Sequence, residues 1–207
     1  MNEPEFTRVT SLLREAGICQ KMPDTPQLRL AAKRGTRVHR ISETFDRHFD
    51  STNLCLMRLD LRGREAYSLT YEEHAGDINR LNLGLDSTLI PYLRALREFR
   101  VGFPIHYTSI EERIDDTGLG LSGCPDRVGT QPNGTVTLID YKTGNEYPWH
   151  KCQLALYAVL LDRIGIKVTQ RVDVYLQRDG SSFFTVHDSA VDIAEAWTII
   201  SQYLLNK

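Results

Sequence analysis

Apolar positions along the chain follow helical spacing in some stretches and strand spacing in others, which predicts a protein with both helices and strands. In one stretch, Val38, Ile41 and Phe45 recur at intervals of three and four residues and form a single apolar stripe. Elsewhere, a glycine marks the end of one predicted helix, and a serine or threonine caps the start of another. Helices are predicted at residues 5–17, about 28–49, 87–100, 149–164 and about 190–205.

Strand patterns dominate the middle of the chain, where β-branched and alternating apolar residues are separated by glycines. Asp179-Gly180 predicts a hairpin between two of the strands. Strands are predicted at residues 106–114, 119–128, 135–141, 172–176 and 183–186. Because helices precede, interrupt and follow the strands, we expect an α/β or α+β fold with a central mixed sheet flanked by helices.

Length and composition indicate a soluble globular protein. With 207 residues, 41% hydrophobic and 25% charged, residues 1–207 are expected to form one domain. Residues 58–85 are rich in charge and weakly patterned, so we expect a mobile or inserted segment there. The N-terminus lacks the layout of a signal peptide and no stretch is long enough to span a membrane. The expected location is the cytoplasm, without a membrane partner.

The positions of the cysteines and the net charge limit which cofactors and binding partners are expected. Cys19, Cys55, Cys124 and Cys152 are scattered and have no histidine partner at zinc spacing, so they are expected to be reduced and partly buried. No phosphate-binding loop for ATP is found, so no nucleotide cofactor is expected. The formal net charge is −2, and any contact with nucleic acid must therefore use a local basic patch.

The most informative stretch is Val136–Lys142, an apolar run that ends with Asp140 and Lys142. Side chains alternate along a strand, so these two charges project from the same face. A buried charge is costly unless it is paired or bound to a metal. Asp126 follows Pro125 just upstream, and two neighbouring carboxylates repel each other unless a cation lies between them. Carboxylate oxygens favour Mg²⁺ or Mn²⁺ over zinc, which predicts a divalent-metal site beside a lysine.

The motifs Gly123-Cys-Pro-Asp126, Ile139-Asp-Tyr-Lys-Thr-Gly144 and Gln153-x-x-x-Tyr157 resemble those of the PD-(D/E)XK nuclease superfamily, in its RecB-like branch. Upstream, Arg34-Gly-Thr-Arg-Val-His39 resembles the Gly-x-x-x-His motif of that branch. Glu111 precedes Asp126 by fifteen residues, where the family has an acidic residue. The resemblance implies a restriction-endonuclease-like core. Because no cysteine follows Cys152, the iron–sulfur cluster of some relatives is not expected.

The resemblance also implies a role for each matching residue. His39, Asp126, Asp140 and the backbone carbonyl of Tyr141 would bind the metal, and Lys142 would orient and activate water. Gln153 and Tyr157, four residues apart on a helix, would face the site. Of the adjacent Glu111 and Glu112, which point to opposite faces of a strand, the spacing favours Glu111 as the residue that faces the site.

Basic residues near His39 are candidates for contact with DNA. Arg34, Arg37 and Arg40 lie around it at helical spacing, either as a phosphate-binding face or as a solvated one. Arg94, Arg97 and Arg100 form a second row with the same two interpretations. Trp149 could stack on a base, although a packing role is the ordinary expectation for such a residue.

The expected function is therefore a metal-dependent DNA nuclease, specifically an exonuclease in recombination, repair or phage DNA metabolism. It would act alone or with a separate recombination or helicase protein, since the chain has no helicase motor. One alternative is a structure-specific endonuclease or nickase that uses the same site. Another is a catalytically silent module that binds DNA or docks a partner.

Overall fold

A mixed five-stranded sheet forms the centre of the molecule in the computed structural model, which describes residues 6–20, 23–48 and 87–207. Its strand order is β2-β5-β6-β7-β8, in which β6 and β7 are parallel and the other neighbours are antiparallel. The strands are β2 (His106–Ile110), β5 (Arg127–Thr130), β6 (Val136–Lys142), β7 (Gln170–Leu176) and β8 (Ser182–His187). The predicted mixed sheet and the hairpin between its last two strands are confirmed.

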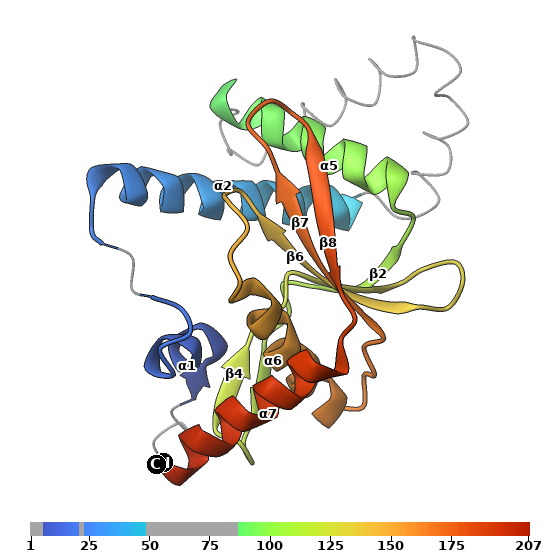
Figure 1. Cartoon of the computed structure of the whole chain (residues 1–207). Coiled ribbons are helices and arrows are strands. Elements are labelled where there is room, and N and C mark those ends of the chain that lie inside the picture. The colour runs from blue at the N-terminus through green and yellow to red at the C-terminus, as the bar shows by residue number, and fades with distance from the viewer. Residues whose placement is uncertain (1–5, 21–22, 49–86) are drawn as a thin grey trace, which may run out of the picture.

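Helices cover both faces of this sheet, with α2 and α5 on one side and α6 and α7 on the other (Figure 1). The apolar stripe of α2 packs against α5 and against Ile139 and Tyr141 of β6. Leu138, the alternate residue of β6, faces α6 and α7. The helices are α1 (Val9–Glu15), α2 (Pro26–His48), α5 (Ile90–Gly102, after the 3₁₀ turn Ser87–Leu89), α6 (His150–Arg163) and α7 (Ala190–Leu205).

A second, smaller sheet explains where the predicted strands were wrong. It consists of β1 (Thr7–Arg8), β4 (Leu121–Gly123) and β3 (Ile114–Asp116), with β4 in the middle. The predicted strands 106–114 and 119–128 are thus each divided between two sheets. The first breaks at Glu111, whose φ of 52° lies in the left-handed region. The second breaks at Pro125, which has no N–H to donate to a ladder.

The remaining elements lie close to their predicted places. Pro26, expected in a loop, starts α2, where its fixed φ suits the first helical turn. Thr7 and Arg8, expected in the first helix, pair with β4 as a short parallel strand instead. The predicted inserted segment 58–85 lies outside the described residues. Among the helices of the described ranges, none has the length and apolar character needed to cross a membrane.

Candidate active site

The candidate site lies where the two sheets diverge. Glu111 directly follows β2, and Asp126 directly precedes β5. The backbone N–H of Glu111 donates to the carbonyl oxygen of Asp126 over 2.9 Å, which places the two acidic residues next to each other. Glu111 has left the strand at this point, so the expected alternation between Glu111 and Glu112 does not apply. The turn at Glu111 instead sets the direction of its side chain.

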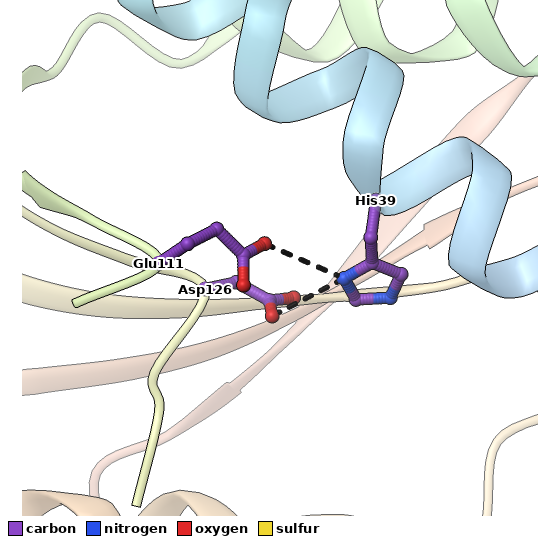
Figure 2. Close-up of side chains that lie close together, drawn as sticks. All are labelled: His39, Glu111 and Asp126. Atoms are coloured by element: carbon purple, nitrogen blue, oxygen red, sulfur yellow. Dashed lines mark ion pairs between the residues drawn. The ribbon is translucent and has the colours of Figure 1, made fainter. Parts of the chain in front are cut away.

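His39 of α2 points toward Glu111 and Asp126 (Figure 2). Its Nδ1 lies 3.2 Å from Oδ1 of Asp126 and 3.7 Å from Oε1 of Glu111. One ligand atom from each of these three residues lies within 4.8 Å of the others. A long helix on one face of the sheet and two strand ends therefore bring an imidazole and two carboxylates together.

Asp126 is buried, and both of its carboxylate oxygens have partners. Oδ2 accepts a hydrogen bond from the backbone N–H of Tyr141 over 2.6 Å, while Oδ1 faces His39. Burial alone would raise the pKa of Asp126, but the ion pair with His39 outweighs it and the pKa is lowered. The same carboxylate holds the pKa of His39 well above its usual value, although burial of the ring opposes the charged form.

Asp140 and Lys142 lie on one face of β6, as the strand alternation predicted, and they form an ion pair. Lys142 Nζ also donates to Oε1 of Gln153 over 2.8 Å. Gln153 Nε2 in turn donates to the hydroxyl of Tyr157 over 3.0 Å. The face of α6 that carries Gln153 and Tyr157 is thus joined to the end of β6 by a chain of hydrogen bonds.

Burial and neighbouring charge shift the pKa values of both strand residues. Burial, and then the nearby Asp126, raise the pKa of Asp140 to about 7. For Lys142, burial favours the neutral amine, but Asp140 and Asp173 outweigh it and raise its pKa. Asp173 is the register partner of Asp140 on β7, is fully buried and pairs with His187 at 2.9 Å. The Lys142 ammonium is therefore a charged hydrogen-bond donor to Asp140 and Gln153.

Arg127 is a structural member of the site that the sequence analysis missed. Its side chain is completely buried, and Nε pairs with Asp46 of α2 at 2.8 Å. One terminal nitrogen donates to Ser42 over 3.0 Å, and the other donates to Glu111 over 3.2 Å and to the carbonyl of Asp126 over 2.6 Å. An arginine directly after the aspartate, within an apolar strand, was the available signal for this role.

The predicted basic patches are only partly at the surface. Arg37 and Arg40 are exposed on α2, whereas Arg34 lies over the ring of Tyr92 at 5.9 Å. Arg100 is buried and pairs with Asp46 at 3.0 Å. The second arginine row is therefore not a continuous surface, because one of its members supports the core.

Trp149 precedes α6 and is half-buried against the core helices. The ammonium of Lys142 lies 5.5 Å from the centre of its ring. The indole therefore has a packing role beside the lysine, as is ordinary for such a residue.

The donor set fits a divalent cation. His39, Glu111 and Asp126 form a compact group of nitrogen and oxygen atoms, and the buried Asp140 is close enough to Asp126 for its pKa to respond. Two neighbouring buried carboxylates repel each other when both are ionised, and a cation bound between them removes this repulsion. Asp140 is paired with Lys142 and lies outside the compact group, while Glu111 lies within it.

The chain belongs to the PD-(D/E)XK nuclease superfamily, whose family model matches residues 11–198. This agrees with the mixed sheet flanked by helices and confirms the superfamily that the sequence motifs resemble. The protein is therefore a member of a nuclease superfamily with a candidate acidic metal site. The RecB-like branch stays a prediction.

Two solved structures are similar over most of the chain. A protein designated SSO0001 shares 16% identity, with 96% of this chain and 84% of that chain covered and a TM-score of 0.38. A candidate exonuclease from Eubacterium rectale shares 10% identity, with 98% and 80% covered and a TM-score of 0.38. Similarity at this level defines no function. No curated protein matches the sequence.

Proposed function

We propose that this protein is a metal-dependent DNA nuclease that hydrolyses phosphodiester bonds, with exonuclease action as the specific form. The observation that carries this proposal is the meeting of His39, Glu111 and Asp126 beside the Asp140–Lys142 pair. A divalent-metal site next to a fixed ammonium suits hydrolysis of a phosphodiester, because both cations stabilise the negative charge that develops on the phosphate oxygens. The family membership supports the same reaction class.

His39, Glu111, Asp126 and Asp140 are the side chains proposed to hold Mg²⁺ or Mn²⁺, together with the backbone carbonyl of Tyr141. Mg²⁺ and Mn²⁺ accept carboxylate and carbonyl oxygens readily, and imidazole is compatible with the group. When bound, such an ion lowers the pKa of a coordinated water and stabilises negative charge on phosphate oxygens. The protein supplies the charge and the fixed positions of these ligands.

Lys142 is proposed to orient the attacking water and to stabilise charge on the phosphate. Its raised pKa keeps the amine protonated, so it acts by donating hydrogen bonds and by electrostatic attraction. Gln153 holds the ammonium from one side at 2.8 Å, and Tyr157 holds Gln153 from the other end at 3.0 Å. We assign Gln153 and Tyr157 a positioning role because they act through Lys142.

DNA would approach over the side of α2 that carries Arg37 and Arg40, which are exposed, with Arg34 at its edge. Arginine binds phosphate through paired N–H donors and suits a backbone that carries one charge per nucleotide. Exonuclease action, a role in recombination, repair or phage DNA metabolism, and a separate helicase or recombination partner are parts of the proposal that rest on the family resemblance.

Digestion of three labelled DNA substrates tests this function. Linear duplex, covalently closed circular DNA and single strands are each incubated with Mg²⁺, with Mn²⁺ and with EDTA. The proposal expects cleavage of substrates with free ends, no cleavage of closed circles, and loss of all cleavage in EDTA. Cleavage of closed circles would favour the endonuclease alternative, and absence of cleavage on every substrate would contradict a nuclease.

A further inference from the structure

A cavity of about 340 Å³ lies beside the metal-ligand group, and Cys124 on its wall contacts Glu111 of that group. This volume lies at the lower end of the range of small-ligand sites, which is about 300–1,000 Å³. Its floor is formed by the last residues of β4 and by Tyr157 of α6. Its rim is formed by Arg8 and Thr10 at the start of α1 and by Arg113 just before β3.

Two contacts connect the cavity with the candidate active site. Tyr157, which lines the cavity, accepts the hydrogen bond from Gln153, and Gln153 binds Lys142. Cys124, also on the wall, places Sγ 3.9 Å from Oε2 of Glu111. Tyr157 and Gln153 therefore connect a group in the cavity to the lysine, and Cys124 alone connects it to a proposed metal ligand.

The charges of the two neighbouring spaces are opposite. The cavity is lined by two arginines and by no acidic side chain, whereas the metal-ligand group beside it carries Glu111 and Asp126. Arg8 is exposed and makes no ion pair with any residue in the described ranges. Arg113, whose side chain is 57% exposed, uses Nε to pair with Asp115 at 2.7 Å.

A molecule that fills both spaces must present an anion to the arginines and a second anion to the cation site. A nucleic-acid strand does this, since successive phosphates repeat along its backbone. Arginine is suited to the contact because its planar guanidinium bonds phosphate oxygens in pairs. The buried hydroxyl of Ser122 adds a polar group to the floor.

We propose that this cavity binds the nucleotide next to the scissile phosphate, with Arg8 and Arg113 holding the phosphate of that neighbouring nucleotide. The inference rests on the proposed nuclease function and deepens it, because it gives a binding site to the part of the nucleic acid that extends from the active site toward α1. It also gives the first helix and the small sheet a place in substrate binding.

The test measures binding separately from cleavage. An Asp140→Asn background prevents turnover, and a fluorescein-labelled single strand is titrated by anisotropy at several salt concentrations. Replacing Arg8 and Arg113 together by Gln is expected to weaken binding by roughly tenfold or more, the effect of losing charge-assisted hydrogen bonds. The slope of log affinity against log salt should fall by about 0.7 for each phosphate that the variant no longer neutralises.

Arg14→Gln is the matched control, because Arg14 is an exposed residue near the other end of α1 and does not line the cavity. It removes the same type of charge and should leave the salt slope unchanged. All variants should keep the thermal unfolding midpoint of the parent, since Arg8 and Arg113 are exposed.

A neutral methylphosphonate moved along the strand locates the phosphate that the arginines hold. One position should weaken binding to the parent protein and have no effect on the Arg8→Gln/Arg113→Gln variant. If no position distinguishes the two proteins, or if the double variant behaves like Arg14→Gln, the cavity does not bind the strand, while cleavage by the wild-type protein would still support the nuclease. Position-specific binding without any cleavage would overturn the proposed activity and leave the cavity assignment intact.

Discussion

The buried guanidinium of Arg127 donates a hydrogen bond to Oε1 of Glu111 over 3.2 Å. The same guanidinium is fixed from behind by Asp46 and Ser42 of α2. Since α2 also carries His39, one arginine links the helix that supplies the imidazole with the turn that supplies a carboxylate. The position of the proposed metal ligands therefore depends on a core ion pair that no substrate touches.

Replacing Arg127 by Lys tests this link. Lysine keeps the charge, but its single nitrogen with three N–H donors cannot replace the bonds of Arg127 to Asp46, Ser42, Glu111 and the carbonyl of Asp126. The free energy of unfolding should therefore fall by about 1–3 kcal/mol. The affinity for Mn²⁺ should fall as well, because Glu111 loses its hydrogen bond. Chemical denaturation and calorimetric Mn²⁺ titration measure the two effects.

Arg29→Lys is the control for that substitution, because Arg29 and its partner Asp24 are 64% and 77% exposed. An exposed pair contributes about 0–1 kcal/mol, so its loss should change stability little and Mn²⁺ binding not at all. Equal behaviour of the two lysine variants would show that Arg127 does not position the site.

Asp140 gives the metal-free protein a specific pH dependence. Its pKa in the folded state is raised to about 7 from 3.8, so the folded state retains a proton that the unfolded state has lost. Its contribution to stability is fully present below the lower value and is lost as pH rises through the higher one. The raised pKa of His39 acts in the same direction above 6.5.

In EDTA, the thermal unfolding midpoint should therefore fall as the pH rises from about 5 to about 8. Asp140→Asn should flatten this dependence, because the titrating carboxyl group is gone. An unchanged pH profile in Asp140→Asn would assign the dependence to other groups.

Gly123, in the motif before Asp126, is required by close packing of β4 on α6. A Cβ at this position would lie 2.9 Å from ring atoms of Tyr157 and 2.9 Å from Leu160. Gly123→Ala should therefore cost about 1–3 kcal/mol and displace Tyr157. Gly144→Ala, where a Cβ meets nothing within 4 Å, should have little effect, and equal stabilities in denaturant would contradict the packing argument.

Much of the fold was predictable because its pattern is local. The strand predicted at 135–141 is β6, whose alternation places Leu138 and Ile139 on opposite faces, and the predicted apolar stripe of α2 packs against the sheet. The division of two predicted strands between two sheets was not predictable from alternation. It depends on the left-handed turn at Glu111 and on the missing N–H of Pro125, which local apolar spacing does not report.

The candidate site, like the fold, was predictable only where its residues are close together in the sequence. Asp140 and Lys142 could be placed on one face because they share a strand. The meeting of His39 with Asp126 joins residues far apart in the sequence and came only from the family resemblance. Arg127, Asp46 and Asp173 were missed because their roles depend on long-range partners, and a single buried charge in a sequence does not reveal its counterion.

Cleavage of end-labelled DNA by Lys142→Ala tests the central claim most directly. Lys151→Ala is the control, because Lys151 lies on α6 but pairs with Asp192 at 3.3 Å, outside the proposed site. With Mg²⁺ or Mn²⁺, the wild-type protein and Lys151→Ala should cleave, while Lys142→Ala should lose at least about 10²-fold in rate. Lys142→Ala should still unfold cooperatively and still bind Mn²⁺. Full cleavage by Lys142→Ala would contradict the assigned role of this lysine and the mechanism that depends on it.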